Sequence, residues 1–297
     1  MPHSIPLPRP VAPRLAFPAL LLGNIVLALG PTFVRFADTG PLSAGFWRLF
    51  LATPILFLLA RRTNPALTTR GMGLAGLWGF LLLAGFCFAA DLASWHGGIL
   101  RTKLANATLF GNVSSLLLPL WGILILRHPV TRLQGIALLL AAAGTAMLMG
   151  ASYELSPRYL AGDLLCILAG FFYFGYVLAI QHVRQKLDSA TVLASATIIG
   201  TPILLIAAIV AGEPVIPTIW WPIILLSLSS QVVGQGLVVY AMPAFSPVVV
   251  GLMLLIQPVV AAIVGRLLFG EILTVADFAG AAAIAAALVL IRWPTRD

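Results

Sequence analysis

Apolar runs of about 20 residues recur along the whole chain, and this feature limits its fold most. A run of that length crosses the hydrocarbon core of a bilayer as a helix. Ten such runs lie between charged residues or Pro and Gly breaks, near 15–36, 41–60, 71–98, 104–126, 131–150, 161–183, 189–211, 218–240, 246–268 and 274–292. Charged residues make up 9% of the sequence, against about 25% in ordinary soluble domains. The sequence therefore predicts an all-α membrane protein with ten transmembrane helices.

The alternative membrane architecture, a β-barrel, does not fit these runs. A barrel strand alternates apolar and polar residues, whereas 131–150 and 274–292 are apolar or small on every face. Their Gly and Ala runs, at 135–144 and 280–287, predict helices that pack with close backbones.

An even split of the ten spans suggests an internal repeat. Five spans per half is an odd number, so a duplicated second half lies inverted in the membrane, as in many transporters. We expect an N-terminal tail at 1–14, a first repeat at 15–150, a connecting loop at 151–160, a second repeat at 161–292 and a C-terminal tail at 293–297.

Basic residues predict the orientation of these spans, because cytoplasmic loops carry an excess of Lys and Arg. With both termini in the cytoplasm, eleven basic residues lie inside: Arg9, Arg14, Arg61, Arg62, Arg70, Arg127, Arg132, Arg184, Lys186, Arg292 and Arg296. Five lie outside, where 151–160 becomes a periplasmic loop: Arg35, Arg101, Lys103, Arg158 and Arg266. We expect a multi-pass inner-membrane protein with cytoplasmic termini.

Several function classes find no support in the sequence. The formal charge of +8 comes from scattered basic residues rather than a patch, so nucleic acid is not an expected partner. The chain has no HExxH, GxSxG or GxxxxGK[ST] motif. We therefore expect neither an enzyme nor a cofactor, and lipid is the surrounding medium.

Asp91 is the carboxylate that lies well inside a predicted span. A charge at that depth costs a few kcal/mol unless it has a partner or a wet cavity. Asp91 either lines a substrate pathway or forms an ion pair with Arg48 of the second span. In the pathway it can bind and release protons, which would then be the coupling ion. For Arg48 itself the sequence favours a structural role.

Other polar side chains gather in the third, fourth, eighth and ninth spans, with smaller contributions from the first and sixth. Trp95 and His96 fit a pathway or an interfacial aromatic belt, while Asn112, Gln231 and Gln235 fit substrate contacts or interhelical hydrogen bonds. Pro119 and Pro258 are candidate hinges. The full set of pathway candidates is Asn24, Asp91, Trp95, His96, Asn106, Asn112, Ser114, Tyr173, Tyr176, Gln231, Gln235, Tyr240 and Gln257.

Three stretches resemble the EamA-type branch of the drug/metabolite transporter superfamily. They are PLSAGFWRLFLATPILFLL at 41–59, LANATLFGNVSSLLLPLWGILIL at 104–126 and VGLMLLIQPVVAAIVGRLLFGEILTVADFAGAAAIAAALVLI at 250–291. Arg48 stands at the family's frequent arginine, and the resemblance covers about 17–291. The first half departs from the pattern, because Arg127-His128 stands where the second half has Gly270-Glu271.

The resemblance implies two inverted five-helix EamA repeats around a central cavity lined by the third, fourth, eighth and ninth helices. We accordingly expect a transporter working by alternating access and exporting a small-molecule substrate, with amino acids, including aromatic ones, as the first class. A multidrug or organic-cation exporter using Asp91 is the alternative within transport. An intramembrane enzyme is the alternative from another class.

Overall fold

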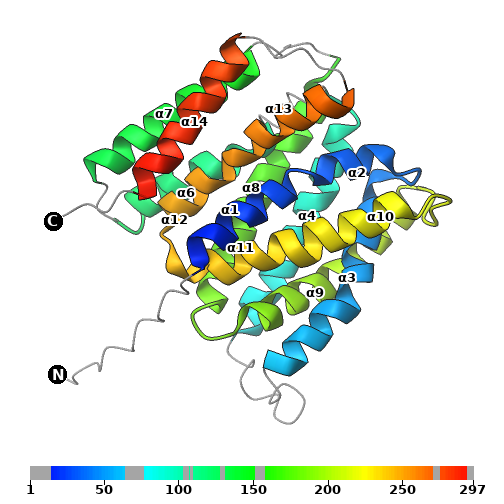
Figure 1. The fold of residues 1–297 in the computed structure, drawn as a ribbon. Coiled ribbons are helices and arrows are strands. Elements are labelled where there is room, and N and C mark those ends of the chain that lie inside the picture. The colour runs from blue at the N-terminus through cyan, green and yellow to red at the C-terminus, as the bar shows by residue number, and fades with distance from the viewer. Residues whose placement is uncertain are drawn as a thin grey trace, which may run out of the picture.

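The computed structural model describes residues 15–63, 77–102, 107, 110–127, 131–150, 158–269 and 275–292. Its regular elements are all helical (Figure 1). In the first half they are α1 (Ala16–Leu27), α2 (Gly30–Phe36), α3 (Pro41–Thr63), α4 (Trp78–Ile99), α6 (Val113–Leu124) and α7 (Arg132–Gly150). In the second half they are α8 (Leu160–Val183), α9 (Ser189–Val210), α10 (Trp221–Leu225), η3 (Leu226–Gln235), α11 (Gly236–Ala241), η4 (Met242–Ala244), α12 (Pro247–Leu254), α13 (Ile256–Phe269) and α14 (Val275–Arg292).

Every predicted span has a helical counterpart among these elements. Seven helical units are long and apolar enough to cross a membrane, and three shorter apolar helices occupy the fourth, fifth and tenth spans. Large apolar side chains cover the outside, for example Leu139 at 74% and Val210 at 82% exposure. Such a surface suits lipid rather than water. The helix of the third span, α4, begins at Trp78, and positions 71–76 of the predicted span lie outside the described residues.

The first and ninth spans are each broken into two helices, where the sequence suggested continuous ones. α1 ends at Leu27 and α12 ends at Leu254. Pro31 and Pro258 follow four residues later, and proline has no N–H for the carbonyl four residues before it. The helical bonds that would continue past Leu27 and Leu254 therefore cannot form.

The eighth span contains a π-helix, η3, between α10 and α11. Its buried residues form three pairs of sequence neighbours, and each pair follows the previous one by four residues: Leu226 and Ser227, Ser230 and Gln231, Gly234 and Gln235. This spacing is wider than the 3.6 residues of an α-helical turn, and a π-helix has the wider turn that suits it.

Contacts between the helices follow two repeats of five. Equivalent helices of the two halves pack on each other: α3 on α9, α6 on α12, and α7 on α14. The third span packs on the sixth through α4 and α8, and the equivalent eighth span packs on the first through η3, α11 and α1. This pattern is that of two inverted five-helix repeats, as the sequence predicted. Figure 1 shows α7 and α14 as a pair at one side of the bundle.

Loop contacts join helix ends that the ten-span order places on one side of the membrane. The Asp38 carboxylate accepts hydrogen bonds from the backbone and hydroxyl of Thr218. On the other side, Asp188 caps α9 and accepts from Thr63 at the end of α3. Partial burial raises the pKa of Asp188, but the hydrogen bonds from Thr191 and Thr63 lower it further, and the net pKa lies below its ordinary value.

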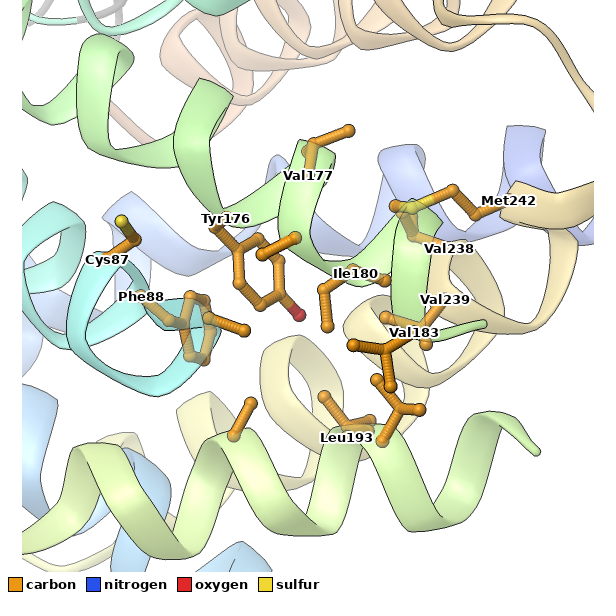
Figure 2. Close-up of a cluster of buried hydrophobic side chains, with 14 of the residues drawn as sticks. Cys87, Phe88, Tyr176, Val177, Ile180, Val183, Leu193, Val238, Val239 and Met242 are labelled. Atoms are coloured by element: carbon orange, nitrogen blue, oxygen red, sulfur yellow. The ribbon is translucent and has the colours of Figure 1, made fainter. Parts of the chain in front are cut away.

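A large apolar cluster packs α4, α8, α9 and the end of the eighth span together (Figure 2). Within it, the rings of Phe88 and Tyr176 stack with centroids 4.6 Å apart. Tyr176 is fully buried there. Cys87 and Cys166 are buried free thiols.

Gly144 sets the distance between α7 and α14. A Cβ at this position would lie 2.7 Å from the Gly280 carbonyl oxygen and 3.0 Å from Ala283 Cβ. The two backbones can approach this closely only without a side chain, which confirms the packing predicted from the Gly and Ala runs.

We predict that Gly144→Ala lowers the free energy of unfolding by about 1–3 kcal/mol, because α7 and α14 must move apart. Gly135→Ala on the same helix is the matched control, since a Cβ there meets nothing within 4 Å. The control should be neutral or slightly stabilising, because alanine favours helix over glycine. Thermal unfolding of the two purified variants in detergent measures the difference, and equal stability would contradict the packing argument.

Candidate functional site

Helices from both halves of the chain meet at a central cavity of about 80 Å³. This volume is several times the ~10–15 Å³ that one water molecule needs. Its polar lining consists of Arg48, Asp91, Asn112, Ser114, Tyr173, Gln235 and Gln257. Its apolar lining consists of Leu27, Ala28, Pro31, Phe88, Leu92, Trp95, Gly111, Leu254 and Ala261. The cavity is therefore amphipathic and can hold water.

Both helix breaks open onto this cavity. Leu27 and Leu254, whose carbonyls lose their helical donors to Pro31 and Pro258, belong to its lining. Irregular backbone at membrane depth is tolerated where it lines a cavity. The two broken spans are also joined directly, because Gln257 Nε2 donates to Asn24 Oδ1 at 2.9 Å. Asn24 Nδ2 in turn donates to the Leu20 carbonyl at 2.8 Å.

Arg48 enters the cavity from α3 with only 3% of its surface exposed. Its Nε donates to Gln231 Oε1 at 3.2 Å, and Gln231 Nε2 donates to Thr197 Oγ1 at 2.9 Å. The guanidinium carbon lies 5.8 Å from the centre of the Phe88 ring. A chain of hydrogen bonds and an aromatic face thus fix the guanidinium.

Asp91 faces the same cavity from α4 and is half-buried. Among the residues that the structure describes, however, no nitrogen of Arg48 lies within 4.0 Å of an Asp91 carboxylate oxygen. The ion pair that the sequence left open as an alternative is therefore not formed.

Uncharged polar groups complete the polar lining of the cavity. Asn112 stands at the N-terminus of α6, and Ser114 follows within its first turn. Tyr173 comes from α8 and Gln235 from the end of η3. Within the described part of the chain, Tyr173 Oη and Gln235 Oε1 are buried without a hydrogen-bond partner. Buried polar atoms of this kind cost free energy, and a bound ligand can satisfy them.

The Trp95 indole closes part of the apolar wall. A Cβ on Gly111 would lie 2.9 Å from the indole Nε1. Glycine at this position leaves room for the ring beside the chain that enters α6. Together with Phe88, Trp95 gives the cavity an aromatic surface.

Several predicted pathway residues lie outside the cavity lining. His96 is fully buried, and its Nδ1 bonds to the Pro41 carbonyl at 2.9 Å. Tyr176 lies in the apolar cluster of Figure 2. Asn24 and Gln231 stand behind the lining and hold Gln257 and Arg48.

The remaining candidates also lie outside the cavity lining or outside the described residues. The Tyr240 backbone carbonyl accepts from Arg184 Nη2 at 3.5 Å, near the end of the eighth span. Pro119 lies inside α6 against Gly251, and Pro258 lies inside α13. Asn106 lies outside the described residues.

Sequence reasoning missed the backbone and apolar part of the site. Leu27 and Leu254 carry no polar side chain, and the available signal was their position four residues before Pro31 and Pro258. Phe88 and Leu92 stand three residues before and one residue after Asp91 in sequence, but apolar residues inside an apolar span carry no signal of their own.

Comparison with known proteins gives three results. The family model for the EamA-like transporter family matches residues 15–150 and again 160–293. An uncharacterized transporter of Archaeoglobus fulgidus is 25% identical over 202 residues, which cover 65% of this chain and 67% of that protein. A crystal structure of a protein superposes with a TM-score of 0.75 at 15% identity, covering 94% of this chain and 95% of the other. The last likeness concerns the fold alone.

We predict that Gln257→Leu lowers the free energy of unfolding by about 1–3 kcal/mol, because Asn24 Oδ1 then stays buried without its donor. Gln181→Leu is the matched control: within the described residues, Gln181 Nε2 is already buried without a partner. The control should cost little or nothing. Thermal unfolding in detergent compares the two, and an equal loss in both would mean that the Asn24–Gln257 bond does not stabilise the broken spans.

Proposed function

Because the chain belongs to the EamA-like transporter family, we propose that it exports a small amphipathic metabolite, with amino acids as the substrate class. It works as a secondary transporter by alternating access. The observation that carries this proposal is the amphipathic cavity at the junction of two broken spans. In transporters, discontinuous helices near the bilayer midplane are the usual place for a substrate site.

The chemistry of the lining supports an amino acid. One arginine, one aspartate, several amide and hydroxyl groups and three aromatic rings line the same space. An amino acid presents the matching set: two opposite charges and a side chain that packs against the rings. An aromatic side chain makes the fullest use of Trp95 and Phe88.

Alternating access opens a central site to one side of the membrane at a time, by movement of one repeat against the other. The Asn24–Gln257 bond joins the first repeat to the second beside the cavity. It is a contact that must change as the site opens.

Asp91 supports one alternative within transport. It faces the cavity and, among the described residues, accepts no hydrogen bond. A carboxylate in this position can bind an organic cation. An exporter of cationic drugs would then use Asp91 as the charge partner, and proton exchange at the same carboxylate could supply the coupling ion.

Counterflow into liposomes containing the purified protein distinguishes these substrates. We expect accumulation of labelled amino acids, aromatic ones first, and not of nucleosides or organic cations. Ala261→Trp should abolish the flux because Ala261 lines the cavity. Ile263→Trp on the same helix is the control, since Ile263 is 49% exposed on the outside. Flux of cations alone would favour the drug exporter, and product formation would indicate an enzyme.

We further propose that the protein lies in the inner membrane with both termini in the cytoplasm. The excess of basic residues on that side supports this orientation. The loop contacts agree with the alternation of ten spans, because Asp38 with Thr218 and Thr63 with Asp188 each join ends on one side.

Thiol labelling of intact cells tests the orientation. A cysteine at position 64 should resist an impermeant reagent, whereas Ile216→Cys, in an exposed loop on the opposite side, should react. The two native cysteines are buried and should give little background. The reverse pattern would overturn the proposed orientation.

A further inference from the structure

A guanidinium and a carboxyl side chain share the cavity without forming an ion pair with each other. Arg48 comes from α3 and Asp91 from α4, and both belong to the lining. Their nitrogen and oxygen atoms stay more than 4.0 Å apart within the described structure. Charges at membrane depth are costly without a partner. A pair that is held apart therefore leaves two unsatisfied groups facing one small space.

The Arg48 guanidinium is positioned to bind an anion. Gln231 engages only its Nε. In the described part of the chain, its two Nη nitrogens have no hydrogen-bond partner. A guanidinium binds a carboxylate through two parallel N–H donors. Thr197 holds Gln231 from behind, so the guanidinium is oriented before a ligand arrives.

The surroundings of Asp91 suit an ammonium group. An ammonium donates three hydrogen bonds and accepts none. Tyr173 and Gln235 line the cavity with Asp91. Their Tyr173 Oη and Gln235 Oε1 atoms are buried without partners, and Gln235 is only 2% exposed. The Asp91 carboxylate and these two neutral oxygens are acceptors that the lining offers to an ammonium.

We propose that Arg48 and Asp91 are the specificity-determining residues of the cavity, binding the carboxylate and the ammonium of one zwitterion. This assignment rests on the transport function proposed above and gives Arg48 a role in binding. A zwitterion satisfies both side chains at once. A simple amine leaves Arg48 without a partner and a simple acid leaves Asp91 without one, so the site discriminates against both.

Gln231 is a positioning residue in this arrangement. It touches Arg48 and Thr197 but does not line the cavity. Its place in η3 links the orientation of the guanidinium to the π-helical segment of the eighth span. Ser227 in the same segment donates to the Arg48 carbonyl at 2.9 Å, so η3 holds both ends of this residue.

Three matched compounds test the assignment: phenylalanine, phenethylamine, which lacks the carboxylate, and 3-phenylpropionate, which lacks the ammonium. Leucine with its amine and acid analogues forms a second set. Each compound competes for counterflow of the labelled amino acid that the wild type transports fastest. In the wild type, the amino acid should compete at least tenfold better than either analogue.

The variants should shift this preference in opposite directions. Arg48→Gln should improve competition by the amine relative to the amino acid by at least tenfold, because the cavity then has no guanidinium that needs a carboxylate partner. Asp91→Asn should improve competition by the acid relative to the amino acid by at least tenfold, because the cavity then has no carboxylate that needs an ammonium partner. Arg62→Gln and Asp38→Asn remove the same charges outside the cavity, and both should keep the wild-type ranking.

A lone buried charge can reduce folding, so the double variant Arg48→Gln/Asp91→Asn accompanies the single ones. It should lose the tenfold preference for the zwitterion and accept the uncharged 3-phenylpropanamide. Wild-type ranking in the neutralised variants, or loss of zwitterion transport without the reciprocal gains, overturns the assignment while leaving amino-acid export intact. If the wild type transports no amino acid, the proposed function itself is refuted.

Discussion

Lipid offers no hydrogen bonds, and this constraint determines where the chain departs from regular helix. Each backbone carbonyl released inside a bilayer needs a cavity, a side chain or a neighbouring helix. The two released at Leu27 and Leu254 belong to residues that line the central cavity. Outside the cavity, prolines such as Pro54 and Pro202 lie within continuous helices α3 and α9. Regular structure is therefore given up where the released groups meet polar space.

The two repeats share their architecture but contribute different chemistry to the site. The charged side chains, Arg48 and Asp91, come from α3 and α4 of the first repeat. Apart from Asn112 and Ser114, the uncharged polar side chains of the lining come from the second repeat: Tyr173, Gln235 and Gln257. A symmetrical scaffold thus carries an asymmetrical binding surface, and a ligand with two unlike ends can have a defined orientation in it.

Hydropathy was sufficient to predict the spans, because an apolar run of about 20 residues has few other uses. Polar residues inside those runs also identified most of the polar lining, including Asp91, Asn112 and Gln235. The depth of a polar residue does not reveal which way it points. His96 and Tyr176 lie at similar depth to lining residues, yet His96 bonds to a carbonyl and Tyr176 stacks on Phe88. These partners come from other helices, and their positions depend on tertiary packing.

Arg48 shows most clearly what packing adds to the sequence. An arginine and an aspartate in adjacent spans suggest an ion pair, which is the least costly arrangement for two isolated charges in lipid. The structure instead gives Arg48 a neutral partner, Gln231, which is fixed by Thr197. This arrangement orients the guanidinium through a neutral amide, so its positive charge is not neutralised by Gln231. The Arg48 Nη groups and the Asp91 carboxyl group have no direct partner among the described residues, and unpartnered polar groups at membrane depth are costly. A structural role for Arg48 would leave that cost unexplained, whereas a ligand that pairs with both groups would offset it.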